Sequence, residues 1–286
     1  MKTNRKLWGL LVALFCCISV LQAEEWWEKR QFLTYSPRYF GPNAFPFPEL
    51  MGGKLPSRWE VEVRGEYHTM PGDQTQDIFA RLYIPIAKGK AGVMANWTIS
   101  EWYKTSEAVR DERSAVETEP AIPCHGDIVL NFFYQVLRSE KWADISVSAN
   151  LKTASGNRLC DARYTDAASY WFDANIGRDL WKNPAYNSFI RIEGLAGFYC
   201  WMTNLEDNRQ NDAICYGGAI SGAWKNLSAR CDLVGFRGYQ DNGDCPLLLR
   251  TKLEYEIKKN IISFRYRHGL HDFLYDSYSL AYIRCF

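Results

Sequence analysis

The sequence predicts an all-β protein, an antiparallel β-barrel of about 10–12 strands. Beyond residue 58, apolar and polar residues alternate with period two in many runs, and turn-forming residues separate those runs. Aromatic residues are frequent, with 11 Trp, 17 Tyr and 15 Phe in 286 residues, and such rings favour pleated, half-buried surfaces. The formal net charge of +1 lacks the basic excess of nucleic-acid binders, so we expect no nucleic-acid partner.

Residues 1–23 have the layout of a secretory signal peptide. Lys2, Arg5 and Lys6 give a positive start, an apolar run follows over 7–21, and Ala23 ends a cleavage site. We therefore expect export and exclude this segment from the fold. Its removal changes the net charge from +1 to −2, because it carries three basic and no acidic residues.

Residues 24–57 predict an extended N-terminal segment. Four prolines lie between Tyr35 and Pro48, which disfavours both helix and interior strand. The same stretch is rich in aromatic residues, which flexible linkers seldom are. We expect its rings to pack on the main body of the protein.

Residues 58–286 predict one barrel domain. About eleven alternating runs are clear, and their length is typical of barrel strands. No crossover helices separate them, which predicts antiparallel pairing. The stretch 101–114 has a local helical pattern, and 154–188 predicts a long loop with one short strand around 169–172. The runs lie at 59–66, 78–86, 93–100, 127–138, 143–153, 189–203, 213–224, 229–240, 247–258, 260–268 and 272–286.

The alternation does not decide which face of the barrel is apolar. In a soluble barrel or sandwich the apolar face lines the core, whereas in a membrane barrel it faces lipid and the polar face lines the lumen. A secreted or periplasmic β-sandwich, or a lipocalin-like protein that binds a carbohydrate or lipid, is therefore an alternative.

The end of the chain favours the membrane barrel. Tyr278, Leu280 and Tyr282 precede the terminal Phe286 at even spacing, while Arg284 departs from the pattern. This resembles the C-terminal aromatic signal of bacterial outer-membrane β-barrel proteins. The resemblance implies an outer-membrane location, with membrane lipid and the barrel-assembly machinery as partners. Aromatic residues near strand ends suggest an interfacial girdle: Trp97, Trp102, Tyr103, Trp201, Tyr275, Tyr278 and Tyr282.

In such a barrel the polar strand faces point into the lumen. An interior of paired charges in about twelve strands leaves a narrow or plugged lumen, which favours a structural or surface-binding role over a diffusion pore. The segments 154–188, 206–212 and 241–244 would then form the binding surface. The charges expected in the lumen are Glu62, Glu66, Arg191, Glu193, Arg250, Lys252, Glu254 and Glu256.

Candidate catalytic residues are few. His271 and Asp272 lie in a turn before the last strand, and His125 lies near Asp127. A His–carboxylate pair suits general-base catalysis, which leaves an outer-membrane lipid hydrolase as an alternative. A turn carboxylate holding a loop histidine is the more frequent arrangement, so a role without catalysis is favoured.

Candidate binding residues lie in the segments between strands. Tyr170 and Trp171 could stack on a glycan. Asp207, Asp212, Asp241 and Asp244 lie in acidic clusters that could offer oxygens to Ca²⁺, although such residues also form ordinary turns. The seven cysteines after the signal segment have no zinc-site spacing, so we expect no cofactor or structural metal. Their odd number leaves at least one thiol unpaired.

Overall fold

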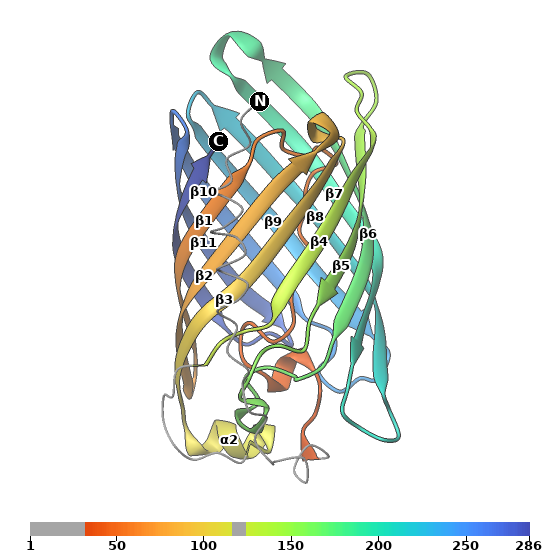
Figure 1. Ribbon diagram of the computed structural model, residues 1–286, viewed down its shortest axis with the longest axis vertical. Coiled ribbons are helices and arrows are strands. Elements are labelled where there is room, and N and C mark those ends of the chain that lie inside the picture. The colour runs from red at the N-terminus through yellow and green to blue at the C-terminus, as the bar shows by residue number, and fades with distance from the viewer. Residues whose placement is uncertain (1–31, 116–123) are drawn as a thin grey trace, which may run out of the picture.

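The computed structural model describes residues 32–115 and 124–286, and the proposed signal peptide lies outside them. The described chain forms twelve strands and one short α-helix (Figure 1). The strands are β1 (Glu60–Met70), β2 (Asp73–Ile86), β3 (Ala91–Thr105), β4 (Ile128–Leu137), β5 (Asp144–Lys152), β6 (Ser169–Asn183), β7 (Ser188–Met202), β8 (Gln210–Trp224), β9 (Leu227–Gly238), β10 (Leu247–Ile257), β11 (Asn260–His271) and β12 (Asp276–Cys285). The helix is α2 (Glu107–Arg113).

The strands form one closed antiparallel barrel, which confirms the predicted fold class. Each strand pairs with its neighbours in sequence, and β1 pairs with β12 to close the cylinder. In this closing pair Glu60 lies opposite Cys285, and Thr69 lies opposite Asp276. Closure gives every strand a partner on both sides.

Two local predictions were wrong. The expected loop over 154–188 contains β6, a full strand of 15 residues. Its inward positions include Asp173 and Asn175, residues typical of turns, so the sequence pattern hid a strand that pairing with β5 and β7 stabilises. The helical pattern at 101–114 also begins too early, because β3 continues to Thr105.

The two ends of the barrel differ. One end carries tight connections at 225–226 and 258–259, together with the start of β1 and the end of β12. The opposite end carries the longer connections, including α2 and the segments 153–168, 203–209 and 239–246 (Figure 1). We call these the turn end and the loop end. In outer-membrane barrels short turns face the periplasm and long loops face outward.

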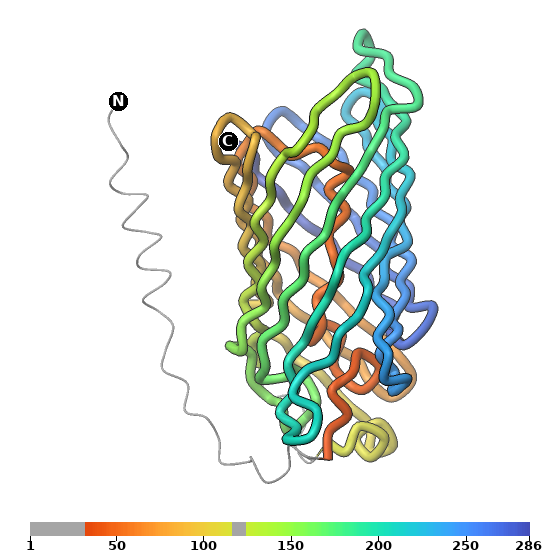
Figure 2. The backbone as a smooth tube through the Cα atoms, turned by 90° about the vertical axis from the view of Figure 1, so that its right-hand side faces the viewer, coloured from red at the N-terminus to blue at the C-terminus, as the bar shows by residue number. Residues whose placement is uncertain are grey.

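Residues 32–57 run inside the barrel from the loop end to the turn end, and we call them the lumen segment (Figure 2). Near the loop end, Trp201 Nε1 donates a hydrogen bond of 2.8 Å to the Tyr35 carbonyl. Further along, the Met51 amide donates to Asn175 Oδ1 at 2.8 Å, and the Leu55 amide donates to Gln135 Oε1 at 3.0 Å. Backbone groups of the lumen segment therefore form hydrogen bonds with side chains of the barrel wall.

The hydrophobic core lies between this segment and the inner wall near the loop end. Phe45 of the segment packs edge-on against Trp201, and Tyr199 stacks between Trp171 and Phe236. The expected girdle is corrected here: Trp201, Tyr103 and Tyr275 are buried inside the barrel. Trp102, Tyr278 and Tyr282 are exposed.

All seven cysteines after the signal segment lie in the described residues, and none forms a disulfide. Most are buried, where a thiol packs as a small apolar group. Among the residues that the structure describes, no helix is both long and apolar enough to span a membrane.

Candidate functional site

The outer surface of the barrel is apolar. Large hydrophobic side chains on nearly every strand are between about two-fifths and two-thirds exposed, as at Val63, Ile220 and Leu280. The residues that alternate with them are buried and largely polar, including Glu62, Asn131, Asp173 and Ser279. The apolar face therefore points outward and the polar face lines the lumen.

An arginine wall dominates one side of the lumen; we use this name for Arg64, Arg81, Arg265 and Arg267 of β1, β2 and β11. Glu62, fully buried, contacts Arg64 at 3.1 Å and both Arg81 and Arg265 at 2.8 Å. Glu66 contacts Arg64 at 2.9 Å and Arg267 at 3.4 Å. Two carboxylates thus face four guanidinium groups, and buried ion pairs of this kind need several partners to offset desolvation.

The other charges expected in the lumen are also paired there. Arg191 contacts Asp144 at 2.7 Å and donates to the Gly52 carbonyl of the lumen segment at 2.6 Å. Lys252 contacts Glu254 at 3.1 Å. The remaining pairs are Glu193 with Arg230, Arg250 with Asp232, and Glu256 with Arg58.

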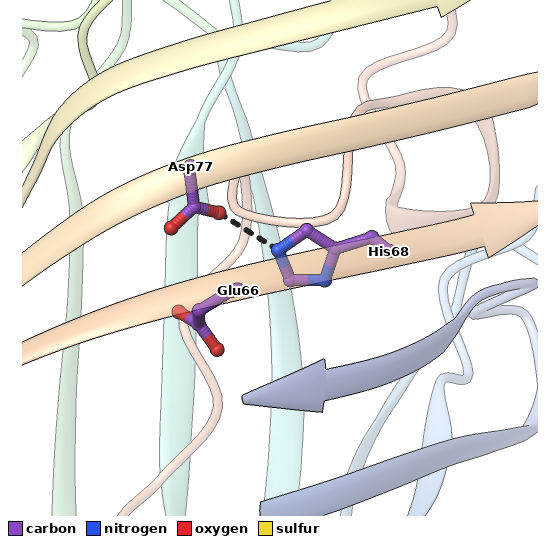
Figure 3. A group of neighbouring side chains, drawn as sticks. All are labelled: Glu66, His68 and Asp77. Atoms are coloured by element: carbon purple, nitrogen blue, oxygen red, sulfur yellow. Dashed lines mark hydrogen bonds and ion pairs between the residues drawn. The ribbon is translucent and has the colours of Figure 1, made fainter. Parts of the chain in front are cut away.

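A fully buried histidine joins the strands at the closing seam. His68 Nε2 of β1 lies 2.7 Å from Asp77 Oδ2 of β2, and His68 Nδ1 lies 2.8 Å from Ser277 Oγ of β12 (Figure 3 shows the first contact). Arg267, which can only donate, lies 3.3 Å from the same Nδ1. We therefore assign Nδ1 as acceptor and Nε2–H as donor to Asp77.

This seam cluster has the composition of a Ser–His–Asp triad, yet its geometry is that of a structural tie. In serine hydrolases the serine contacts Nε2 and the acid contacts Nδ1, which is the reverse of this arrangement. Ser277 is also completely buried, so a substrate carbonyl has no approach to its hydroxyl in this conformation. Sequence reasoning missed the cluster, although the inward position of each residue follows from strand alternation.

The same cluster contains a possible metal-ligand set. Glu66, His68 and Asp77 each offer one ligand atom, and these atoms lie within 4.8 Å of one another (Figure 3). Two guanidinium groups, those of Arg64 and Arg267, already contact Glu66 and supply positive charge there. The chemistry of the cluster therefore favours internal ion pairing over a cation site.

A second buried network closes the loop end. Arg163 is fully buried and contacts Asp73 and Glu101, each at 2.8 Å. The Tyr164 hydroxyl donates to Glu101 at 2.8 Å, and burial together with this carboxylate raises the pKa of Tyr164 well above its usual value. Asn43 of the lumen segment donates to Asp77 at 2.8 Å and to Glu101 at 3.0 Å. One amide thus links the lumen segment to both buried networks.

Of the two expected His–carboxylate pairs, His271 and Asp272 are in contact, whereas Asp127 is bound by other partners than His125. His271 Nδ1 lies 3.2 Å from Asp272 and 3.0 Å from the Cys245 carbonyl, in an exposed turn at the loop end. Asp127 instead binds Lys152 Nζ at 2.7 Å and the Gly156 amide at 2.6 Å. The buried His125 Nε2 has no hydrogen-bond partner among the described residues.

The expected glycan platform is also corrected. Tyr170 lies beside Phe172 and Phe198, both exposed on the outer face. Trp171 points the other way and is only 1% exposed, because successive strand residues face opposite sides of the sheet.

The four expected acidic ligands do not form one cluster: Asp207 lies in the connection before β8, Asp212 lies in β8, and Asp241 and Asp244 share the connection between β9 and β10. Asp207 and Asp241 are exposed, and Asp212 is half-buried. Asp244 is buried and accepts the Gln240 amide at 2.9 Å, which is a turn-stabilising contact. Within 32–115 and 124–286, the one group of three side chains suited to a metal is the seam cluster rather than these loops.

Comparison with solved structures supports the barrel geometry. An outer-membrane channel from Pseudomonas putida F1 matches with a TM-score of 0.57 and 11% identity, covering 84% of this chain and 100% of that chain. The fold is that of an outer-membrane β-barrel. Together with the apolar outer surface, it places the protein in the outer membrane.

Weaker matches include the KdgM porin and the β domain of the Bordetella autotransporter BrkA, each with a TM-score of 0.49. The porin is 11% identical and covers 79% of this chain and 99% of its own; the β domain is 8% identical and covers 80% and 99%. No family model matches the chain, and no curated protein matches it by sequence.

Proposed function

We propose that this protein is a closed outer-membrane barrel with a surface-binding or structural role, rather than a general diffusion pore. The observation that carries the proposal is the lumen segment, which occupies the barrel from the loop end to the turn end. Its backbone is bonded to the wall at successive levels through Trp201, Asn175 and Gln135. A pore open to solutes needs that volume empty.

The contacts of the lumen segment resist its displacement. Arg191 and Arg230 donate to the Gly52 and Leu50 carbonyls, each at 2.6 Å, and both side chains are also paired with wall carboxylates. Charge-assisted hydrogen bonds of this kind are stronger than neutral ones. Removing the segment would leave these buried cations short of acceptors, and a buried charged donor without a partner costs free energy.

The loop end is the surface on which binding would occur. It carries α2 and three of the longer connections, and in outer-membrane barrels the long loops face away from the cell. The segments 206–212 and 241–244 lie there, as does the part of 154–188 that precedes β6. The ligand class we favour for this surface is a glycan or lipid.

Liposome swelling tests the closed state. Wild-type protein reconstituted into liposomes should admit a neutral monosaccharide no faster than protein-free liposomes do. A chain lacking residues 33–50 should swell its liposomes faster, provided that it shows the heat-dependent gel shift of a folded barrel. Rapid swelling with wild-type protein alone would overturn the proposal, whether or not the deletion variant folds.

A further inference from the structure

The lumen contains a cavity that is lined by arginines on one side. It lies between the lumen segment and the strands β1–β4, β6, β10 and β11, and holds about 860 Å³ of empty space, counting the part open to solvent. Five arginines line it, namely the four of the arginine wall and Arg250, against the carboxylates of Glu49 and Asp127. Asp127 is already bound to Lys152 at 2.7 Å.

Glu49 is the only acidic residue in the sequence of the lumen segment. Its side chain is exposed within the barrel and lines the cavity. It makes no hydrogen bond and no ion pair within 4.0 Å to any residue of the described ranges, although it lies in the field of Arg64, Arg81, Arg250 and Arg265. The Glu49 carboxylate therefore lies near the arginine wall without forming an ion pair with it.

Several N–H groups of the arginine wall are left without an acceptor among the described residues. The Nε atoms of Arg64, Arg81 and Arg267 are buried and have no hydrogen-bond partner in the described chain. The Arg64 guanidinium also lies 3.8 Å over the Phe79 ring, and this cation–π contact holds the guanidinium in place. Pre-positioned guanidinium groups match the oxygens of carboxylate and phosphate, which they can bind in pairs.

We propose that this cavity binds a small solute bearing a carboxylate or phosphate group, in competition with the Glu49 side chain. Without a bound solute, solvent fills the cavity and the negative charge of Glu49 offsets part of the positive charge of the arginine wall. A bound carboxylate or phosphate group would offset the charge of these arginines in place of Glu49. This inference is independent of whether the barrel conducts, because binding needs the cavity and not a through-pore.

Calorimetric titration of the detergent-solubilised full-length protein at low salt tests the proposal, since screening weakens such binding. The probes are inorganic phosphate, malonate and the neutral malonamide. Phosphate or malonate should bind wild type, and malonamide should not. Binding of phosphate alone identifies a phosphate site, and binding of malonate alone identifies a carboxylate site.

Two variants and a control sharpen the test. Glu49→Gln removes the competing charge and should tighten oxyanion binding by about tenfold, as expected for one unit charge a few ångströms away in a partly solvated site. Arg81→Gln should weaken it, while Glu62 keeps its contacts with Arg64 and Arg265. The control Arg284→Gln changes an arginine of β12 that lies outside the cavity lining and donates to Asn260 at the turn end, and it should leave binding unchanged.

Two results would contradict the proposed oxyanion site. Absence of heat with both oxyanions in wild type and in Glu49→Gln would overturn the proposal, because the variant removes the only competitor. Equal binding of malonamide and malonate would overturn it as well, since charge would then play no part.

Discussion

Gly53 of the lumen segment passes so close to β5 that a Cβ atom on it would lie 2.1 Å from the Asp144 carbonyl oxygen. Its φ of +70° is also a conformation that side chains disfavour. Glycine is therefore required at the point where the segment lies against the barrel wall. A substitution at Gly53 should therefore weaken the contact between the lumen segment and the wall without changing any charge.

Gly53→Ala should displace the turn-end part of the lumen segment. The clash is with backbone, so the segment must shift and its contacts near Leu55 should weaken. Limited proteolysis of the folded protein should cut within residues 32–57 faster than in wild type.

Gly65→Ala is the matched control, because nothing lies within 4 Å of the position its Cβ would take. Its digestion pattern should equal that of wild type. If Gly53→Ala resists the protease as wild type does, the close approach does not hold the segment in place.

Asn43→Ala should destabilise the barrel, because Asp77 and Glu101 each lose a donor while remaining buried. Both carboxylates keep other donors, and a hydrogen bond to a charged group contributes about 1.5–3 kcal/mol. The free energy of unfolding in urea should fall by this amount. Asn226→Ala, in the exposed turn between β8 and β9, should change it little, and equal effects of the two substitutions would contradict the buried network.

Lys152→Met should be more damaging. The Lys152 ammonium group is fully buried and donates to Asp127, Thr165 and the Ala167 carbonyl. Its removal leaves a buried carboxylate unpaired, a change that costs about 3–5 kcal/mol. The temperature at which the folded gel band disappears should drop markedly.

Lys182→Met provides the comparison, since Lys182 is about half exposed and lies 4.0 Å from an exposed Glu140. Exposed pairs contribute about 0–1 kcal/mol. A drop for Lys152→Met no larger than that for Lys182→Met would argue against the buried pair.

Cys245 should react slowly with alkylating reagents. It lies in the loop-end connection 239–246, where burial and the neighbouring Asp244 raise the pKa of its thiol. A raised pKa means less thiolate at pH 8, so the rate with iodoacetamide should be below that of free glutathione and should increase as the pH rises further. Mass spectrometry of the modified peptide gives the rate, and a rate equal to that of glutathione would refute the expectation.

The strand pattern was largely predictable because alternation reports which side of a sheet each residue occupies. The runs around Leu253 and Glu254 show this: one side chain faces outward and the next pairs with Lys252 inside. The pattern failed at β6, where Asp173 and Asn175 look like turn residues but face a polar lumen. Alternation also could not predict that residues 32–57 lie inside the barrel, because an extended proline-rich segment has no period-two pattern that reports its position.

The site was harder to predict for a related reason. His68, Asp77 and Ser277 are each inward residues on separate strands, and only the closure of β12 on β1 brings the serine to the histidine. The expected pair His271–Asp272 was adjacent in sequence and proved to be a turn contact. Proximity along the chain was a poorer guide than strand register.

The conductance of single barrels in a planar bilayer tests the central claim, that residues 32–57 close the lumen. Wild-type protein should insert without producing large, stable conductance steps, because the lumen segment and the paired charges of the wall fill the cross-section. Large steps that persist in wild-type protein, with no variant and no denaturant present, would contradict the account.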